Sequence, residues 1–388
     1  KGGGRRAEAE RIYAHPLPLL FEPHASTSTS LVGLLGLPIK RVVNPRCTGI
    51  FELATRSVWV TDARDARVLW TRGFFGKGNL SRSEPSWKAR QENARKAARA
   101  GKMTSEEVTA QRRAERQQFK QDRARALAEV AAAAEATFTA TGAVMSAEEQ
   151  KANVPSAATW KKPQTEQAAK QVGQEGRRDG DEDKDWDDIE DLEHLQLTLS
   201  EAFFLAWALD CLTVLHPDTL EPMTLSDMWS AFQNVYLPLG GDVVPPESLR
   251  TDNPFILHYV FYHHYRSLGW VVKTGIKFCV DYLLYKRGPV FHHAEFAMVL
   301  VPAYEDENER RTSPFDLAGA EPSSWVWLST LNRVNSQVMK TLVLAYVTIP
   351  SAERLAAGRA SIGSPGAIGM YSVREVTVRR FIPARMRD

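Results

Sequence analysis

The sequence has few cysteines, no long apolar run and almost no net charge. Its three cysteines, Cys47, Cys211 and Cys279, lie far apart and form no CxxC pair, which excludes a disulfide framework and predicts a reducing compartment, cytosol or nucleus. The longest apolar stretch, 202–215, is too short for a bilayer and is interrupted by Asp210, so we predict no transmembrane helix. A net charge of +2 means that any nucleic-acid affinity has to come from local patches.

Length and composition are those of an ordinary soluble globular protein. The 388 residues can hold two or three domains, and 43% hydrophobic with 25% charged residues supply a core and a solvated surface. The sequence shows no secretory leader and begins at Lys1 rather than at methionine, so we expect it to be trimmed or renumbered. Composition separates residues 1–87, 88–190 and 191–388.

Residues 1–87 alternate short apolar runs with turn residues, which is typical of a small β-rich module. The module ends in residues 73–85, where closely spaced glycines predict a tight loop. No helix opens after a strand there, so a structural turn is favoured over a phosphate site. The strands expected in this module cover 31–37, 49–53, 56–60 and 68–70.

Residues 88–190 are strongly charged. Segment 72–125 carries 15 Lys and Arg against 6 Asp and Glu, whereas segment 175–193 carries 11 acidic and 3 basic residues. A capping box predicts a solvated single helix over 108–129, and 140–188 is predicted to be a disordered linker. Contact of the basic segment with RNA phosphates, or a role as an adaptor for another RNA or protein, is the alternative to a plain solvated surface.

Residues 191–388 have the apolar periodicity of a folded core. Residues 191–270 are predicted to form a small helical subdomain, and 271–388 an α/β unit, so the fold class is α/β (α+β). The helices are expected at 195–215, 223–237, 253–268 and 323–338, and the strands at 270–273, 277–285, 295–302, 340–349 and 371–382.

Strand topology is expected to bring three reactive side chains together. The strand ending at Tyr285 and the strand after His293 are joined by a loop containing Gly288-Pro289, which predicts an antiparallel pair. The second strand continues through the helix 323–338 to the strand that Lys340 opens, and such a crossover makes the two strands parallel. Tyr285, His293 and Lys340 therefore converge if both strands share one sheet.

A phenol, an imidazole and an ammonium can together cleave RNA without a metal. Internal attack by the 2′-oxygen needs a base, an acid for the leaving 5′-oxygen and a cation for the phosphorane. His293, with a reference pKa of about 6.5, suits the acid, and Lys340, with about 10.4, suits the cation. Tyr285 as base needs a pKa below its usual value of about 10. We expect Lys286, Arg287 and Lys340 to lower it by favouring phenolate.

Plainer interpretations of these residues stay open. A tyrosine at a strand end usually packs, a His-His pair is commonly a surface turn, and a lysine opening a strand is commonly an edge charge. Arg333, in the helix before Lys340, is a candidate to stack on an unpaired RNA base. Trp325 and Trp327, in the same helix, are predicted to belong to the core.

Metal-dependent alternatives are weaker. The histidine pairs 263–264 and 292–293 lack a cysteine or a cluster of carboxylates to complete a ligand set. A nuclease site built on Asp281 and Glu295 lacks the lysine expected two residues after the glutamate, because Ala297 stands there. We therefore predict no metal and no cofactor.

Three segments carry specific motifs. They are residues 265–296 (YRSLGWVVKTGIKFCVDYLLYKRGPVFHHAEF), 73–83 (GFFGKGNLSRS) and 371–383 (YSVREVTVRRFIP). Together they resemble the catalytic subunits of tRNA-splicing endonucleases, and within that family the eukaryotic subunit that cuts at the 5′ splice site. The resemblance covers about 1–87 and 195–388, whereas 88–190 carries no family motif.

The resemblance implies a C-terminal nuclease domain of the tRNA-intron-endonuclease type with a Tyr-His-Lys triad. Those roles fall on Tyr285, His293 and Lys340. His293 is preferred over His292 because the family's His-small-polar-aromatic pattern fits residues 293–296. The insertion at 303–323 lengthens the spacing to Lys340 and is expected to loop out.

The resemblance also implies substrate and partners. Intron-containing pre-tRNA would be cut to a 2′,3′-cyclic phosphate and a 5′-hydroxyl within a heterotetramer of this chain, a second catalytic subunit and two structural subunits. Arg333 matches an arginine that clamps a bulge base at the partner's active site, and Lys286 and Arg287 are expected to bind substrate. The C-terminal strand 371–382 is a plausible subunit interface, because an exposed apolar edge is otherwise a liability.

Two further expectations accompany this interpretation. We expect the nucleus as the compartment, with the cytoplasmic face of mitochondria as the alternative. The alternative function is a non-catalytic structural subunit that grips tRNA in the same complex.

Overall fold

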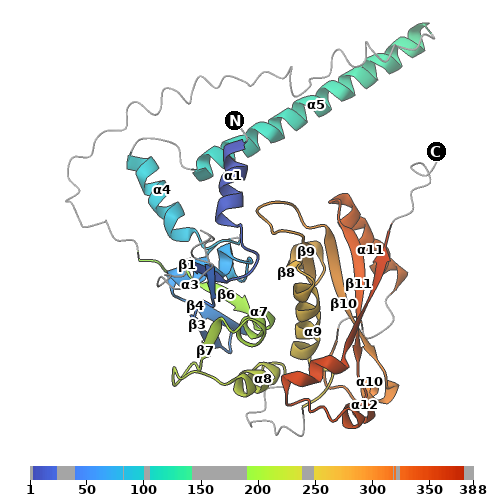
Figure 1. Cartoon of the computed structure of the whole chain (residues 1–388). Coiled ribbons are helices and arrows are strands. Elements are labelled where there is room, and N and C mark those ends of the chain that lie inside the picture. The colour runs from blue at the N-terminus through green and yellow to red at the C-terminus, as the bar shows by residue number, and fades with distance from the viewer. Residues whose placement is uncertain are drawn as a thin grey trace, which may run out of the picture. The chain divides into compact units, whose positions relative to one another are not determined.

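The structure of this chain is a computed structural model that describes residues 3–23, 40–81, 83–99, 105–141, 190–237, 249–317, 319 and 324–379. The chain divides into two compact units, one formed by Lys1–Ser86 with Glu193–Asp388 and the other by Trp87–Leu192 (Figure 1). Among the described helices, none has the length and apolar character needed to cross a membrane.

The unit Trp87–Leu192 contains the helices α4 (Trp87–Arg99) and α5 (Ser105–Thr141). Helix α5 confirms the helix predicted over 108–129 and extends it at both ends. Its described side chains are mostly exposed, as expected for a helix without a continuous apolar stripe. The predicted linker lies outside the described residues from residue 142 to 189.

The larger unit contains two sheets of five strands and a separate pair of strands within its described residues. Its helices are α1 (Gly3–Ile12), α3 (Ala63–Thr71), α7 (Leu199–Phe203), α8 (Leu225–Asn234), α9 (Pro254–Ser267), α10 (Glu307–Arg311), α11 (Trp325–Gln337) and α12 (Ala352–Ala357), with shorter helical turns at Phe204–Ala208, Ile276–Phe278 and Pro365–Met370. Its strands are β1 (Leu20–Pro23), β2 (Lys40–Val43), β3 (Cys47–Glu52), β4 (Ser57–Val60), β5 (Lys77–Gly78), β6 (Leu195–Thr198), β7 (Leu212–Leu215), β8 (Val271–Thr274), β9 (Tyr282–Tyr285), β10 (Phe296–Tyr304), β11 (Thr341–Ile349) and β12 (Ser372–Val378).

The C-terminal sheet has the strand order β12-β11-β10-β9-β8. Strand β10 pairs antiparallel with β9 and parallel with β11, so both predicted pairings and the mixed sheet are confirmed. Strands β10 and β11 are buried along most of their length because helices cover both faces of the sheet. Helix α9 packs on one face and α11 on the other (Figure 1).

The second sheet has the order β5-β6-β4-β3-β7. Its strands β3, β4 and β5 come from the N-terminal segment, whereas β6 and β7 follow the charged insertion. Residues 1–87 and 191–270, which we predicted as separate domains, thus contribute to one sheet. One apolar core extends from this sheet through α9 to the C-terminal sheet.

The helix predicted over 195–215 is wrong at both ends. Only residues 199–208 are helical, and they are flanked by strands β6 and β7. Leu195 and Leu197 are buried while the residues between and after them are less buried, which is a period of two. Asp210, with a φ of 48°, turns the chain out of the helix before β7.

The N-terminal strand predictions have mixed outcomes. Strands at 49–53 and 56–60 are confirmed as β3 and β4, and 31–37 lies outside the described residues. The strand predicted at 68–70 is wrong, because these residues belong to helix α3. The Asp62 side chain caps that helix by accepting a hydrogen bond from a backbone amide of its first turn.

Most of the other predicted elements are confirmed, whereas α1, α10, α12, β1 and β2 were not predicted. Helices α8, α9 and α11 match the predicted helices, and strands β8, β10, β11 and β12 match the predicted strands within a few residues. Strand β9 is shorter than expected because residues 276–278 form a helical turn that Cys279 closes with a φ of 56°. Asn253 and Pro254 begin α9, whose side chains are buried almost throughout.

The glycine-rich loop is a structural turn, as favoured. The Gly76 amide donates to the Glu201 carboxylate at 3.1 Å, and the Lys273 Nζ donates to the Gly76 carbonyl at 2.6 Å. The Arg266 guanidinium donates to the Gly73 carbonyl. These groups are therefore satisfied within the protein.

Candidate active site

Strand pairing brings the predicted triad to one end of the C-terminal sheet. Immediately before β10, the Glu295 amide donates to the Leu284 carbonyl at 3.1 Å, and the Thr341 amide donates to the Glu295 carbonyl at 3.0 Å. Tyr285 and Lys340 each lie one residue beyond these partners. With strands about 4.8 Å apart, their backbones flank Glu295 at a separation of about 10 Å. The predicted convergence of strand ends is confirmed.

Tyr285 and Lys340 also project from the same face of the sheet. Side chains two residues apart on a strand share a face. Tyr285 therefore shares its face with Leu283, and Lys340 shares its face with Leu342. Both leucines pack in the apolar cluster beneath α11, so the two candidate catalytic groups lie on that side.

The Lys340 ammonium contacts a backbone carbonyl and an aromatic ring. Lys340 is 9% exposed, and its Nζ donates a hydrogen bond to the Ala294 carbonyl at 3.3 Å. Ala294 directly follows His293. The Nζ also lies 4.9 Å from the centroid of the Phe278 ring. Burial lowers the pKa of Lys340. Within the described chain no carboxylate pairs with this ammonium, so its charge is available to an incoming phosphate.

Asn335 organises the surroundings of Lys340. Its carbonyl accepts the Lys340 amide at 3.0 Å, and its side-chain amide donates to the Phe278 carbonyl at 3.3 Å. Asn335 is fully buried on the sheet side of α11. Sequence reasoning missed both Asn335 and Phe278. A signal was present, because a polar residue four positions after the apolar Leu331 stands on the inner face of a predicted helix.

Tyr285 does not have the lowered pKa that we expected. Burial raises the pKa of its hydroxyl. Lys286 and Arg287 are exposed beyond the strand end, where water screens their charge, and Arg287 lies 3.8 Å from the Glu10 carboxylate. Desolvation therefore outweighs the neighbouring cations. The phenol is neutral near pH 7 and supplies only a small phenolate fraction.

The histidines lie in the turn between β9 and β10. Both His292 and His293 are exposed, and the His292 amide donates to the Gly288 carbonyl at 3.4 Å. Gly288 has a φ of 124°, a conformation that favours glycine. His293 adjoins Ala294, whose carbonyl holds Lys340. The preference for His293 over His292 stays a prediction.

Helix α11 carries Arg333 on its exposed surface. Two residues rotate a helix by about 200°, so Arg333 projects roughly opposite to Asn335 and away from the sheet. In the described part of the chain its side chain has no recorded hydrogen bond or ion pair. Trp325 was predicted as core, which is wrong, since it is 85% exposed at the first position of α11. Trp327 packs partly against the cluster beneath the helix.

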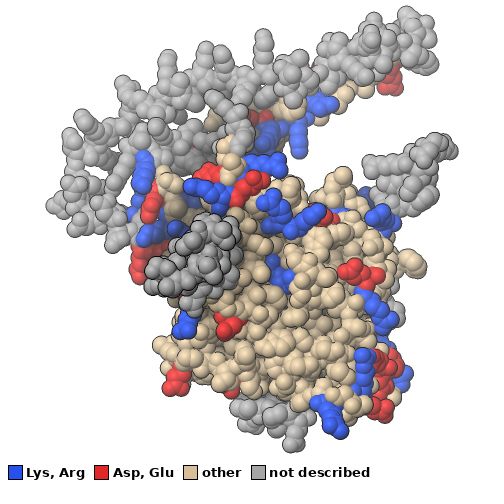
Figure 2. All heavy atoms as spheres, in the orientation of Figure 1, with Lys and Arg blue, Asp and Glu red and all other residues tan. Residues whose placement is uncertain are grey.

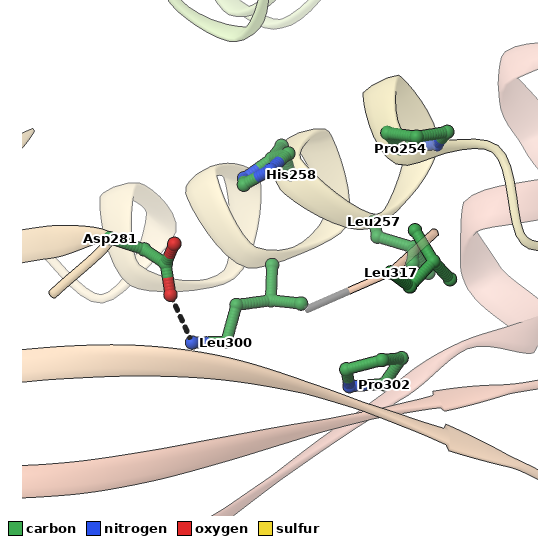
Figure 3. Close-up of a pocket in the computed structure, with 7 residues that line it drawn as sticks. All are labelled: Pro254, Leu257, His258, Asp281, Leu300, Pro302 and Leu317. Carbon is green, nitrogen blue, oxygen red and sulfur yellow. Dashed lines mark hydrogen bonds between the residues drawn. The ribbon is translucent and has the colours of Figure 1, made fainter. Parts of the chain in front are cut away.

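The carboxylates of the metal-dependent alternative are far apart. Asp281 precedes β9 and Glu295 lies beside its last residues, so about four residues of strand, roughly 13 Å, separate them. The Asp281 carboxylate accepts the Leu300 amide at 2.8 Å instead (Figure 3). Among the described residues, no group of three or more His, Cys, Asp or Glu is placed to hold a metal ion.

A small pocket lies beside Asp281 between α9 and β10 (Figure 3), and Lys340 is not among the residues that line it. Its polar part includes His258, whose Nδ1 lies 2.9 Å from the Tyr282 hydroxyl. Apart from His258 and Asp281 the lining is apolar, and neither an apolar wall nor a carboxylate suits a phosphodiester. The lining residues are Pro254, Leu257, His258, Asp281, Leu300, Pro302 and Leu317.

Two further features concern the protein surface. Figure 2 shows basic side chains around the end of the sheet that carries the β9–β10 turn, above a broad uncharged face. Strand β12 forms an edge of the C-terminal sheet, and most of its side chains are exposed. Val376 is 48% exposed there.

Comparison with known proteins gives a consistent picture. A family model described as "tRNA intron endonuclease, catalytic C-terminal domain" matches residues 255–353. The chain is 36% identical over 349 residues to the Schizosaccharomyces pombe protein "Probable tRNA-splicing endonuclease subunit sen2", covering 85% of this chain and 84% of that relative. It is 32% identical over 356 residues to tRNA-splicing endonuclease subunit SEN2 of Saccharomyces cerevisiae, covering 86% and 84%. Subunit Sen2 of Rattus norvegicus is 35% identical over 196 residues, covering 50% and 36%.

Proposed function

The chain belongs to the Sen2 family of tRNA-splicing endonuclease subunits, and we propose that it is the catalytic subunit that cuts intron-containing pre-tRNA at the 5′ splice site. Its activity is that of an endoribonuclease, a tRNA-intron lyase. The family match covers strands β8 to β11 of the C-terminal sheet and the helices α9 and α11 that pack on it, and it ends before β12. The proposed catalytic groups, Tyr285, His293 and Lys340, lie within the matched residues.

In the proposed reaction the 2′-hydroxyl loses its proton to the Tyr285 phenolate while its oxygen attacks the adjacent phosphorus. The bond from phosphorus to the 5′-oxygen breaks, and His293 donates a proton to that oxygen. Lys340 offsets the negative charge that develops on the phosphorane. The products are a 2′,3′-cyclic phosphate and a 5′-hydroxyl, and no metal takes part.

The observation that carries this proposal is the environment of Lys340. Lys340 is 9% exposed as a residue, and its ammonium has no carboxylate partner among the described residues and contacts the residue after His293, across β10 from Tyr285. Desolvating a cation costs several kcal/mol. A purely structural subunit would not require a cation without a carboxylate partner at this place.

Replacing His293 with alanine in the assembled complex tests the proposal, with His292→Ala as the matched control. The two residues are adjacent and both are exposed, so neither substitution should disturb folding. We expect His293→Ala to slow the 5′ cut by about 10²–10⁴-fold and to leave the 3′ cut unchanged. His292→Ala should leave both cuts unchanged.

Three outcomes would contradict the proposal. Undiminished 5′ cutting by His293→Ala would support the structural, tRNA-gripping alternative. Loss of the 5′ cut in His292→Ala but not in His293→Ala would show that the His292 imidazole is the acid. Loss of wild-type cutting in excess EDTA, with the complex still folded, would support a metal-dependent reaction.

The complex proposed for this chain contains a second catalytic subunit and two structural subunits. Strand β12 is the proposed interface, because its outer edge is unpaired within the described chain. Arg333 would hold a substrate base at the partner's site, which agrees with its projection away from Lys340. Lys286 and Arg287 would contact RNA phosphates, so Lys286→Ala should weaken pre-tRNA binding less at high salt than at low salt.

We propose the nucleus as the compartment, with the cytoplasmic face of mitochondria as the alternative. The three cysteines described in the structure are all free, which agrees with a reducing environment. Fluorescence microscopy of the tagged full-length protein, with nuclear and mitochondrial markers, distinguishes the two.

A further inference from the structure

The Gly-Phe-Phe-Gly segment at residues 73–76 has no role in the reaction as proposed, yet it packs against the turn that leads to His293. Phe74 is 3% exposed, and its ring lies directly over Gly288. A Cβ built on Gly288 would lie 2.6 and 2.7 Å from two carbons of that ring, closer than real Cβ contacts. The turn can approach the ring only because residue 288 is a glycine.

The segment that presents Phe74 is held in one conformation. Gly73, Phe74 and Gly76 have φ values of 112°, 60° and 71°, so the chain makes a tight left-handed turn. The Gly73 carbonyl accepts a hydrogen bond from the buried Arg266 side chain, and the Gly76 carbonyl accepts one from the partly buried Lys273 side chain. A non-glycine residue with positive φ stores strain that the surrounding structure has to offset. Here that structure fixes the direction of the Phe74 ring.

The same ring belongs to an aromatic cluster that reaches the candidate catalytic tyrosine. Trp70, Phe74 and Val271 are its buried members, and Tyr285 packs against them. Trp70 contacts Phe74 edge-on, with ring centroids 5.7 Å apart. Val271 pairs with Tyr285 in the register of β8 and β9. Tyr285 thus packs against a cluster to which the N-terminal segment contributes Trp70 and Phe74.

The cluster also holds the turn after Tyr285. The Phe291 ring meets Phe74 edge-on at 6.4 Å, and Tyr13 stacks on Phe74 at 5.2 Å. The Arg287 guanidinium lies 4.2 Å from the centroid of the Phe291 ring. Tyr13 is itself tied down, because its hydroxyl donates to the Glu84 carboxylate at 3.1 Å.

We propose that Phe74 is a positioning residue for the 5′ cut: its ring supports Tyr285 and the 286–293 turn, and so sets the distance between base and acid. This inference rests on the proposed function of Tyr285 and His293. Phe74 itself touches no reacting atom. A displacement of about 1 Å in a catalytic group can reduce a rate by about 10²-fold.

The test compares Phe74→Ala with Phe75→Ala in the assembled complex. Phe75 is the adjacent residue and is fully buried, but it packs against Phe204 and Arg266 in the main core. We expect Phe74→Ala to lower the single-turnover rate of the 5′ cut by about 10–100-fold at saturating complex. The half-saturating concentration and the rate of the 3′ cut should change less than threefold. Phe74→Leu, which keeps apolar bulk over Gly288, should restore most of the rate.

Phe75→Ala should lower the melting temperature at least as much as Phe74→Ala, while the 5′ rate below that temperature stays within threefold of wild type. The inference is overturned if Phe74→Ala keeps the wild-type 5′ rate, or if its 5′ and 3′ rates fall together. It is also overturned if Phe75→Ala loses the 5′ rate equally. His293→Ala, assayed alongside, separates the two proposals, because failure of that variant to lose the 5′ cut contradicts the proposed function itself.

Discussion

Replacing Lys340 with methionine tests whether its positive charge contributes to the cleavage rate or to the stability of the fold. Methionine keeps an unbranched apolar chain and removes the ammonium. Loss of one preorganised electrostatic stabiliser reduces a rate by about 10²–10³-fold, or about 2.7–4 kcal/mol of transition-state stabilisation. We expect the single-turnover rate of the 5′ cut to fall by that factor.

The free energy of unfolding should change little. The variant loses a hydrogen bond from a charged donor to the Ala294 carbonyl, about 1.5–3 kcal/mol, and a ring contact with Phe278, about 0.5–2 kcal/mol. It also removes the partial desolvation of the ammonium of a residue that is 9% exposed, which costs up to several kcal/mol. Because these contributions oppose each other, the expected net change is about 1 kcal/mol or less.

The pH dependence gives a second measurement of the same charge. Burial lowers the pKa of Lys340 in the folded chain, so between that value and the unfolded value the unfolded state binds more protons. Stability of the wild-type protein therefore contains a contribution that rises with pH in this window. Lys340→Met lacks it, so the variant's stability relative to wild type should decrease as pH approaches about 10.4.

Urea unfolding measures the change in stability, and single-turnover cleavage measures the change in the 5′ rate. Lys273→Met is the stability control. The Lys273 side chain is 16% exposed, and its Nζ lies 3.4 Å from the buried Glu201 carboxylate. Breaking such a pair costs about 3–5 kcal/mol. If Lys340→Met destabilises the chain as much as Lys273→Met, Lys340 is a structural residue. A 5′ rate within threefold of wild type would refute the catalytic role.

Three further results are expected. Because burial raises the pKa of Tyr285 and lowers that of Lys340, an alkaline decline of the 5′ rate below about pH 10 should come from loss of the Lys340 charge and be absent in Lys340→Met, whereas a decline near pH 8 that persists in Lys340→Met would contradict this. Arg333→Ala should slow the 3′ cut about tenfold, as expected for loss of a base-stacking contact of about 1–3 kcal/mol, while loss at the 5′ site alone would oppose action at the partner's site. Val376→Asp, on the exposed edge of β12, should prevent co-purification of partner subunits and change the free energy of unfolding by less than about 0.5 kcal/mol, whereas intact assembly would exclude that edge.

The nuclease sheet was predictable because local signals carry its topology. The Gly288-Pro289 turn implied the antiparallel pair, and the helix before Lys340 implied the parallel one. The prediction was wrong where one apolar run is compatible with both a buried helix and buried strands. The run at 195–215 is dense enough in apolar residues for a buried helix, yet its ends are strands that complete a sheet with distant N-terminal segments.

Trp325 shows a different limit. Its position in α11 was predicted correctly, but a large apolar residue at a helix start is buried only if another element covers it. Within the described chain it is 85% exposed. Composition could not show this, because exposure depends on which neighbours the fold brings to that turn.

The order of elements along the chain was enough to predict which reactive groups stand at the strand ends and that these ends lie together. Tyr285 and Lys340 follow from that order, since chain connectivity and handedness leave few arrangements. The electrostatic environment of these groups, in contrast, depends on the three-dimensional packing. The raised pKa of Tyr285, the ring and carbonyl around Lys340 and the contact of Phe74 with Gly288 all depend on atoms from distant segments. Desolvation and packing sum over such neighbours, and no local pattern contains them.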